Sequence, residues 1–273
     1  IARVLCAGLL FWGSNIKSSG IIFICMENNM SIKKYCTAVI PAAGTGIRMG
    51  TKIKKQFLKL GEKEIIACTI EKFEQCEEID EIVLATTKDT MELLWSIVKR
   101  EGFQKVSTIV EGGKERQHSV YAGICAANKK AEIIVVHDGV RPFVEVEDIK
   151  KTIIMAQQKG ACVLGVKAKD TIKICNTENE IVTTPQRNLV WYIQTPQTFQ
   201  KDLLLRAFER AEKENFVGTD ESMLIERDGN IVFVIEGHYE NIKITTPDDI
   251  VIAEAFLKKE KGELVEKEKE KYY

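Results

Sequence analysis

A glycine-rich segment early in the chain carries residue types that could bind a triphosphate. It reads Pro41-Ala-Ala-Gly-Thr-Gly-Ile-Arg-Met-Gly50 and is followed by Lys54-Lys-Gln-Phe57. Small side chains let backbone N–H groups approach phosphate oxygens, and Arg48 and Lys55 could place positive charge against the α- and β-phosphates. The segment lacks the G-K-[ST] of a Walker A loop, and Met49 stands where a dinucleotide fingerprint needs glycine. The alternative is a glycine-rich turn with solvated lysines.

A second polar segment, Val110-Glu-Gly-Gly-Lys-Glu-Arg-Gln-His-Ser119, joins a predicted strand to a predicted helix. The chain turns at Gly112 and its neighbour, and the helix N-terminus that follows could hold a base or a phosphate. Arg116 and Ser119 are one helical turn apart and share a face. His118 is expected to be exposed. The alternative is a plain turn followed by a solvated first helical turn.

A third segment, Val136-His-Asp-Gly-Val-Arg-Pro142, places an acidic residue directly after a buried strand. In α/β sheets ligands bind at the carboxyl ends of the strands, so Asp138 is well placed to hold Mg²⁺ between nucleotide phosphates. Arg141 would face an acceptor phosphate or support the loop. The alternative for Asp138 is a turn cap, and His137 is expected to be a core histidine without a catalytic role.

Further hydroxyl, amide and cationic side chains are scattered over the C-terminal half. Each is compatible with a helix cap or a solvated surface residue, but together they could bind a polyol and its phosphate. We find no Ser-His-Asp or Cys-His signature, so no covalent enzyme intermediate is expected. The segments concerned are Asp170-Thr171, Arg187, Thr195-Pro196-Gln197, Gly218-Thr-Asp-Glu221 and Asn241-Ile-Lys-Ile-Thr-Thr-Pro247.

Hydrophobic periodicity predicts the elements that position these residues. Apolar runs alternate with segments of helical periodicity, which indicates an α/β fold with a mostly parallel twisted sheet flanked by helices. Strands are predicted over 36–41, 81–87, 106–110 and 133–137, and helices over 65–75, 90–101, 115–127 and 147–159.

The pattern changes after Gly160. Short β-type runs over 161–167, 171–175, 181–184 and 189–194 have no helix between them and indicate a β-rich extension or arm. Helices are predicted over 202–213 and 220–227, and strands over 230–236 and 241–245. A closing helix over 248–257 fits Thr246 as N-cap and Pro247 at the first helical position.

Composition limits the partners and the compartment. The chain of 273 residues has a formal net charge of −1, so bulk attraction to nucleic acid or to a membrane surface is not expected. Its 8 cysteines include no C-x-x-C pair, which is typical of reduced thiols in a cytoplasmic protein.

The two ends are set apart from the domain. Residues 1–30 contain an apolar run, 4–12, that is too short to span a bilayer. We interpret them as an over-extended gene start, with Met26 or Met30 as the initiator, or as a disordered extension. Residues 31–258 are expected to form a single domain with its arm at about 167–190, and 259–273 a charged tail.

Seven ordered blocks resemble one family. PAAGTGIRM with KKQF, EGGKERQHSV, VHDGVRPF, KDTIK, QTPQ, GTDES and NIKITTPDD, spread over 37–257, resemble the 2-C-methyl-D-erythritol 4-phosphate cytidylyltransferases of the non-mevalonate isoprenoid pathway. The resemblance implies a Rossmann-like nucleotidyltransferase fold and a protruding β-arm that exchanges with a second subunit of a homodimer. It also implies Mg²⁺-dependent transfer of CMP from CTP to the sugar-alcohol phosphate, with release of pyrophosphate.

Matching the family's blocks assigns expected roles to residues of this chain. Arg48 and Lys55 resemble the pair that stabilises charge at the α-phosphate, and Arg187 and Lys243 resemble the pair that positions the acceptor phosphate. Asp138 matches the metal-binding aspartate. The implied CTP contacts are Pro41, Ala42, Ala43, Gly44, Gly46, Gly112, Arg116 and Ser119. The implied acceptor-side residues are Asp138, Arg141, Thr171, Thr195 and Thr219, with Thr171 and Arg187 reaching across the dimer.

The chain departs from the family's pattern in places, and two alternatives stay open. Gly139-Val140 replaces two alanines, Pro185-Gln186 precedes Arg187 where Val-Asp is more usual, and Glu240 stands where Asp is common. One alternative is a cytidylyltransferase acting on ribitol 5-phosphate. The other is a non-catalytic nucleotide-binding module of the same fold. A dehydrogenase is excluded by the missing third glycine.

Overall fold

A computed structural model describes residues 33–44 and 53–262. The chain divides into two units, residues 1–33 and residues 34–273, and the second unit contains the described helices and strands. The candidate initiators and two predicted site residues, Gly46 and Arg48, lie outside the described residues.

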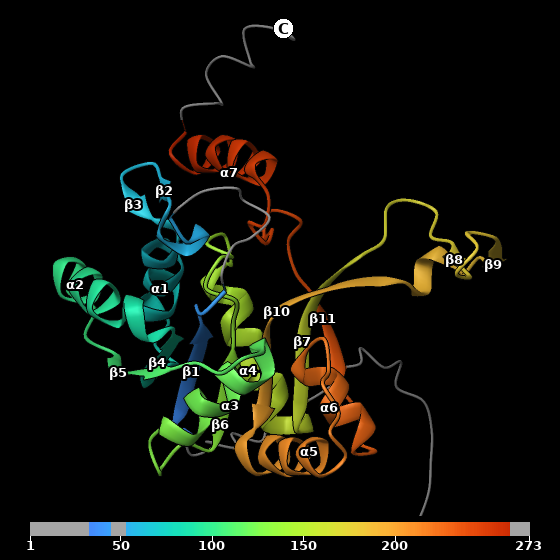
Figure 1. The fold of residues 1–273 in the computed structure, drawn as a ribbon, viewed down its shortest axis with the longest axis horizontal. Coiled ribbons are helices and arrows are strands. Elements are labelled where there is room, and N and C mark those ends of the chain that lie inside the picture. Colours follow the sequence, from blue (N-terminus) through green and yellow to red (C-terminus); the bar gives the residue numbers. More distant parts are fainter. Residues whose placement is uncertain (1–32, 45–52, 263–273) are drawn as a thin grey trace, which may run out of the picture. The chain divides into compact units, whose positions relative to one another are not determined.

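A central sheet organises the second unit (Figure 1). Among the described residues it has seven strands in the order β11-β7-β10-β6-β1-β4-β5. Strand β10 is antiparallel to β6 and β7, and the other neighbours are parallel, as predicted for a mostly parallel sheet. The strands are β1 (Cys36–Pro41), β4 (Glu81–Thr86), β5 (Val106–Glu111), β6 (Ile133–Val136), β7 (Ala161–Lys167), β10 (Trp191–Gln200) and β11 (Phe233–Glu236).

Helices cover both faces of this sheet, which explains why the parallel strands β1, β4 and β6 consist mostly of apolar residues. Successive strand side chains point to opposite faces. Ala38 and Ile40 of β1 pack in the layer of α1, α2 and α4, whereas Val39 packs in the layer of α3, α5 and α6. The helices are α1 (Ile65–Gln75), α2 (Met91–Glu101), α3 (Arg116–Ala126), α4 (Val146–Lys159), α5 (Lys201–Lys213) and α6 (Glu221–Arg227).

A small third cluster closes the domain beside the ends of the strands. The antiparallel pair β2 (Lys59–Leu60) and β3 (Lys63–Glu64) and the closing helix α7 (Pro247–Glu260) pack against buried Phe143. Helix α7 begins as predicted, because Thr246 and Asp249 form a reciprocal capping box with Pro247 at the first position. The 3₁₀ turns among the described residues are η2 (Lys55–Phe57), η3 (Lys88–Thr90) and η4 (Arg187–Leu189).

The predicted strand over 241–245 is wrong. This segment is irregular because its backbone bonds to several different elements in place of one strand. Asn241 O accepts from Arg141 Nη1 at 2.8 Å, and Ile244 N donates to Val140 O at 3.0 Å. The segment is thereby tied to the loop that follows β6. The predicted strand over 230–236 is shorter than expected and begins at Phe233.

The β-type runs after β7 form a hairpin and one long strand. The hairpin strands β8 (Ile174–Cys175) and β9 (Ile181–Thr183) pair with each other, and Figure 1 shows them away from the central sheet. Apolar side chains on the hairpin are exposed, including Ile181 (62%) and Val182 (65%). Within the described residues no helix is long and apolar enough to cross a membrane.

Candidate active site

One pocket collects most of the predicted site residues. It has a volume of about 300 Å³ and lies where the loops after β1, β5 and β6 meet, because parallel strands bring their carboxyl ends to the same edge. Its lining residues are Pro41, Ala42, Ala43, Gly44, Lys55, Gln56, Gly113, Lys114, Glu115, Arg116, Ser119, Asp138, Val140 and Lys243.

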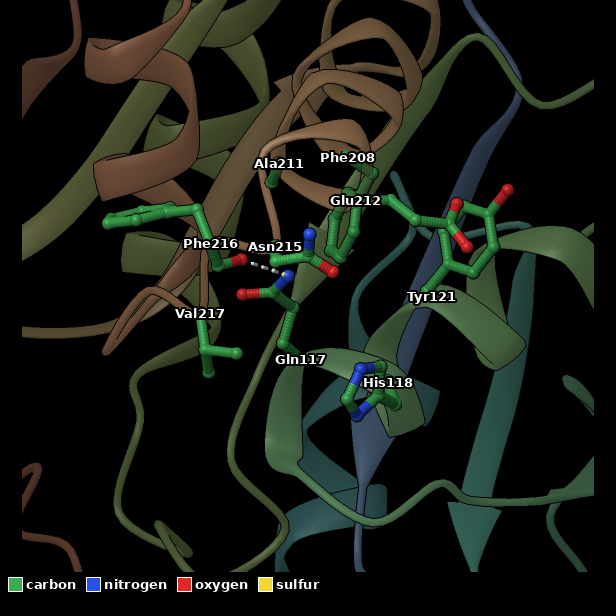
Figure 2. A pocket seen from close by; sticks show the side chains of 9 residues that line it. All are labelled: Gln117, His118, Tyr121, Phe208, Ala211, Glu212, Asn215, Phe216 and Val217. Atoms are coloured by element: carbon green, nitrogen blue, oxygen red, sulfur yellow. Dashed lines mark hydrogen bonds between the residues drawn. The ribbon is translucent and has the colours of Figure 1, made fainter.

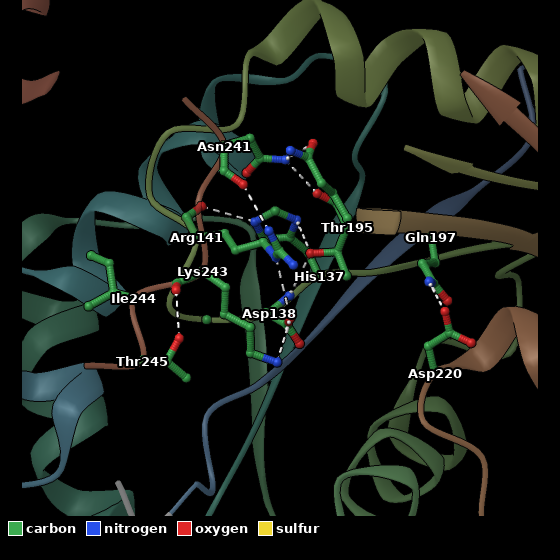
Figure 3. A network of polar contacts seen from close by, with 12 residues as sticks. His137, Asp138, Arg141, Thr195, Gln197, Asp220, Asn241, Lys243, Ile244 and Thr245 are labelled. Atoms are coloured by element: carbon green, nitrogen blue, oxygen red, sulfur yellow. Dashed lines mark hydrogen bonds and ion pairs between the residues drawn. The ribbon is translucent and has the colours of Figure 1, made fainter. Parts of the chain in front are cut away.

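Asp138 is the centre of the charge in this pocket. Its Oδ1 accepts from Arg116 Nε at 2.9 Å. Its Oδ2 lies 3.0 Å from Lys243 Nζ and 3.4 Å from Arg141 Nε (Figure 3). Burial by itself raises the pKa of this carboxyl, but Arg116, Lys243 and Arg141 hold the pKa far below its usual range. Asp138 is therefore an ionised group with a fixed position.

A chain of hydrogen bonds fixes the backbone beneath Asp138. Asp138 N–H donates to Thr195 Oγ1 at 3.1 Å, and this hydroxyl lies 3.0 Å from His137 Nδ1. His137 Nε2 lies 3.1 Å from Arg141 O (Figure 3). Because a carbonyl can only accept, Nε2 carries the proton and Nδ1 accepts from the Thr195 hydroxyl. Thr195, predicted as an acceptor contact, thus bonds to the protein in this structure.

His137 is a buried residue, as expected of a core histidine. Its side chain packs beside Phe73, with ring centroids 4.9 Å apart, and has no exposed surface. Burial lowers the pKa of His137 to about 4, so the ring is neutral at physiological pH. A neutral imidazole with both nitrogens bonded holds the turn after β6 in place.

The two nucleotide-side loops are held by a common threonine. Thr86, at the end of β4, donates through its hydroxyl to Ala42 O at 3.2 Å, and its carbonyl accepts from Gly112 N at 2.7 Å. Gln56 Nε2 also donates to Ala42 O. The loops after β1 and β5 are therefore fixed relative to each other.

The turn into α3 has no room for a larger residue at its first glycine. A Cβ added at Gly112 would lie 2.7 Å from Ser119 Oγ and 3.0 Å from Ala43 Cβ. Ser119 is buried, and its Oγ accepts from Gly113 N at 3.1 Å. Ser119 was predicted to contact CTP, and in this structure it closes the glycine turn. His118 is exposed, as expected, and shares a capping box with Glu115.

Two neighbouring lysines after the glycine-rich loop point to different partners. Lys55 Nζ donates to Ile244 O at 3.1 Å and lines the pocket. Lys54 pairs with Asp89 at 2.8 Å, on the connection between β4 and α2. Of the two, Lys55 places its charge next to the segment that carries Lys243.

Two residues of the polar segments received no individual role from the sequence, and the structure connects them to the site. Glu221, with 1% of its side chain exposed, accepts from Arg116 Nη1 at 2.7 and 2.9 Å. Gln197 Oε1 accepts from Glu221 N at 3.1 Å. Its Nε2 donates to Asp220 Oδ2 at 2.8 Å (Figure 3). Both residues belong to blocks that the sequence singled out, but nothing in their spacing connects them to Arg116.

Five predicted acceptor-side residues are absent from the pocket lining: Arg141 and Thr195, which bond to the turn that carries Asp138, and three exposed residues. Arg187, in η4, is exposed and donates to Lys169 O at 3.2 Å. Thr171, between β7 and β8, and Thr219, before α6, are also exposed. Within the described part of one chain these three side chains are not brought to the pocket lining.

A second pocket of about 320 Å³ lies on another face of α3 (Figure 2). It is lined by Gln117, His118 and Tyr121 of α3, by α5 side chains, and by residues 215–217. Gln117 crosses to Phe216 O with a hydrogen bond of 3.2 Å. This pocket contains no lysine or arginine in its lining, so the first pocket is the candidate site for an anionic substrate.

The residues present are compatible with a magnesium ion that arrives with a nucleotide. The described residues contain no group of three or more His, Cys, Asp or Glu side chains that could hold a metal. Mg²⁺ in nucleotide sites is held by one or two carboxylates together with phosphates and waters, and Asp138 supplies one. Lys243, with 37% of its side chain exposed, would have to turn away from that carboxylate.

Comparison with known proteins decides the family. Residues 36–259 match the family model of 2-C-methyl-D-erythritol 4-phosphate cytidylyltransferase. This chain belongs to that family. The resemblance predicted from the seven blocks is confirmed, and the chain is therefore a nucleotidyltransferase.

Curated cytidylyltransferases are similar along nearly their whole length. The protein of that name from Alkaliphilus oremlandii is 45% identical over 223 residues, which cover 81% of this chain and 94% of the relative. The one from Clostridioides difficile is 46% identical over 230 residues, covering 84% and 96%.

Solved structures from the cytidylyltransferase family share the fold. The 4-diphosphocytidyl-2C-methyl-D-erythritol synthase from Anaerococcus prevotii has a TM-score of 0.75 and 34% identity, covering 83% of this chain and 97% of that chain. The cytidylyltransferase from Thermus thermophilus has a TM-score of 0.67 and 28% identity, covering 81% and 98%. The predicted nucleotidyltransferase fold is confirmed.

Proposed function

We propose that this chain transfers CMP from CTP to 2-C-methyl-D-erythritol 4-phosphate, giving 4-diphosphocytidyl-2-C-methyl-D-erythritol and pyrophosphate. The observation that carries the proposal is the convergence of Lys55, Arg116 and Lys243 with Asp138 in one pocket. Such a set of cations suits a reaction between two anions. The relatives that share the family are named for this activity.

The reaction requires charge neutralisation and alignment more than proton transfer. A phosphate oxygen of the acceptor attacks the α-phosphorus of CTP, forming a new P–O bond. The bond from that phosphorus to the bridging oxygen of the β-phosphate breaks, and pyrophosphate leaves with the electron pair. A phosphate monoester is largely deprotonated near neutral pH, so no general base is needed. The neutral, buried state of His137 agrees with this scheme.

The cations have separate roles in this scheme. Lys55, with Arg48, stabilises the negative charge that develops at the α-phosphate. Lys243, with Arg187, positions the acceptor phosphate. Asp138 would hold Mg²⁺, which would neutralise and orient the triphosphate when bound. Arg141 supports Asp138 and the loop that bears it.

Small residues and backbone groups form the nucleotide side. The loop after β1 and the glycine turn after β5 both line the pocket and are fixed by Thr86. The small side chains of Ala42, Ala43, Gly44 and Gly113 would let backbone N–H groups approach the base and the phosphates. The residues proposed to contact CTP are Pro41, Ala42, Ala43, Gly44, Gly46, Gly112, Arg116 and Ser119.

The β8–β9 hairpin is proposed to complete the site of a second subunit. Its exposed apolar side chains need a covering surface, and the exposed Thr171 and Arg187 lie in the same arm. In a homodimer these two residues would reach the partner's acceptor site, together with Thr195 and Thr219 of the receiving subunit. We also propose a cytoplasmic enzyme with residues 31–258 as its catalytic domain; Cys76 and Cys162 are free thiols.

Product analysis tests the proposal. The purified full chain is incubated with CTP, Mg²⁺ and methylerythritol 4-phosphate. The products are separated by chromatography and identified by mass spectrometry. We expect a cytidine diphosphate ester of methylerythritol. If ribitol 5-phosphate gives a cytidine diphosphate ester and methylerythritol 4-phosphate gives none, the acceptor is ribitol 5-phosphate. A folded protein that binds CTP and forms neither product would be the non-catalytic module.

A further inference from the structure

A buried carboxylate on α6 has one cationic partner among the described residues, and that partner lines the pocket. Both oxygens of Glu221 accept from Arg116 Nη1, at 2.7 and 2.9 Å, and only 1% of the Glu221 side chain is exposed. Burial raises the pKa of Glu221, and the neighbouring guanidinium opposes that rise. An uncompensated buried charge is strongly unfavourable, so the Glu221 carboxylate depends on Arg116 for its compensation.

The same guanidinium contacts the central aspartate. Arg116 Nε donates to Asp138 Oδ1 at 2.9 Å while Nη1 binds Glu221. A guanidinium is planar, so two bonds from two of its nitrogens fix the plane of the whole group. Arg116 is itself a pocket-lining residue. The orientation of Glu221 is therefore transmitted to Asp138 through one rigid group.

Glu221 is held by the backbone of its helix. Gln197 Oε1, on β10, accepts from Glu221 N at 3.1 Å and from Ser222 N at 3.0 Å. Asp220 Oδ1 accepts from Met223 N at 3.0 Å and caps the first turn of α6. The start of α6 is thus anchored to the central sheet, and the Glu221 carboxylate has a defined place from which to hold Arg116.

Stability alone gives a weak reason for this arrangement. A buried ion pair contributes little net stability compared with a well-packed apolar pair, because both charges must be desolvated. We propose that Glu221 is a positioning residue for the nucleotide side of the site: it holds the Arg116 guanidinium in the plane in which it contacts Asp138 and lines the pocket. This inference rests on the proposed cytidylyltransferase function, for which Glu221 would hold Arg116 in position.

The first test compares Glu221→Gln with a matched control on the same helix. Glutamine keeps the size of the side chain but removes its charge and turns a donor toward Arg116. Residues that orient a site's ligands typically cost about 10-fold or more when changed, so we expect kcat/KM for CTP to fall by about 10-fold. The KM for the acceptor should stay within about 2-fold. Glu226→Gln, an exposed position of α6, should behave like the wild type.

The second test asks whether Glu221 acts through Arg116. In an Arg116→Ala background, adding Glu221→Gln should cost less than about 2-fold further in kcat/KM for CTP, because the residue to be positioned is gone. The added Glu221→Gln change should also raise the melting temperature above that of Arg116→Ala alone, because it removes the buried Glu221 charge that Arg116→Ala leaves unpaired. If the loss of kcat/KM for CTP in the double variant equals the product of the losses in the two single variants, the proposal is wrong.

CTP affinity, measured by calorimetry without acceptor, separates this inference from the proposed function. A wild type that binds CTP but does not turn over methylerythritol 4-phosphate would refute the proposed acceptor, while the effect of Glu221→Gln on CTP affinity would still test the inference. If Glu221→Gln does not fold, Glu221→Asp keeps the charge on a shorter side chain and should weaken CTP binding in the same Arg116-dependent way. Wild-type CTP affinity in the folded variant would overturn the proposal.

Discussion

Lys243 Nζ lies 3.0 Å from the Asp138 carboxylate, joining the irregular segment before α7 to the end of β6. Asp138 is also bonded to Arg116 and Arg141, whereas 37% of the Lys243 side chain is exposed. Lys243 is therefore the cation of this group that can most readily turn to a phosphate. In the proposed mechanism it exchanges the carboxylate for the acceptor phosphate.

Replacing Lys243 should affect the acceptor more than the nucleotide. Lys243→Met keeps the aliphatic stem but removes a charge-assisted hydrogen bond, so we expect the KM for methylerythritol 4-phosphate to rise by about 10-fold or more. The KM for CTP should change much less. Steady-state kinetics with each substrate varied in turn provide the measurement. Lys259→Met, whose lysine pairs with Glu240 on the surface, is the control. Equal changes in both KM values would contradict the assigned role.

Replacing Lys55 should lower turnover with the fold intact. Lys55→Ala removes a fixed cation from the α-phosphate, and the loss of one such group costs on the order of 10²-fold in kcat. Circular dichroism and the melting temperature should stay close to those of the wild type. Lys59→Ala, an exposed lysine on the adjacent β2 strand, serves as the control. A kcat for Lys55→Ala within a few-fold of wild type would show that Lys55 has another role.

Stability should fall on mild acidification because of His137. Burial lowers the pKa of His137 from 6.5 to about 4, so between these values the unfolded chain binds a proton that the folded chain does not. Stability from this residue is therefore present above pH 6.5 and is lost as the pH falls. The expected slope approaches about 1.4 kcal/mol per pH unit, or about 3 kcal/mol over the whole window.

His137→Gln isolates that contribution. Urea unfolding is measured at several pH values between about 5 and about 8. The free energy of unfolding should fall less steeply with pH below about pH 6.5 in the variant than in the wild type, and the two curves should run parallel above about pH 7. The buried carboxylates are common to both proteins, so the difference reports His137. Identical slopes in the two proteins would mean that His137 is protonated in the folded state as easily as in the unfolded chain.

The hairpin surface should mediate self-association. Val182 on β9 is 65% exposed, and Val182→Asp places a charge in an apolar interface. We expect sedimentation velocity to show a dimer for the wild type and a monomer for the variant, with CTP binding retained and acceptor turnover reduced. Glu178→Gln, at the exposed turn of the same hairpin, should remain dimeric. A wild type that is monomeric at micromolar concentration would refute the proposed role of the arm.

The sequence predicted the central sheet and its helices well because their burial is periodic. Strand β1 alternates its apolar residues between two helical layers, and α1 begins and ends where the periodicity does. The predicted strand over 241–245 failed for a physical reason. Asn241 Nδ2 donates to Thr195 O at 2.9 Å, and the backbone there bonds to the loop after β6, which no local pattern reveals.

The site was predictable in its residue types but not in its pairings. Asp138, Lys55 and Lys243 share the pocket, as their blocks indicated. The link between Arg116 and Glu221 spans 105 positions and depends on how α6 packs against the start of α3, so spacing alone could not indicate it. Thr195 bonds to the backbone of Asp138 for the same kind of reason, since only the folded chain brings β10 beside the end of β6.

Pyrophosphate release tests the central claim most directly. The purified full chain is given Mg²⁺, CTP or ATP, and either methylerythritol 4-phosphate or ribitol 5-phosphate, and released pyrophosphate is followed with a coupled assay. We predict release with CTP and methylerythritol 4-phosphate, and none with ATP or without acceptor. Release with ribitol 5-phosphate but not with methylerythritol 4-phosphate, or no release from a folded protein with either acceptor, would contradict the account.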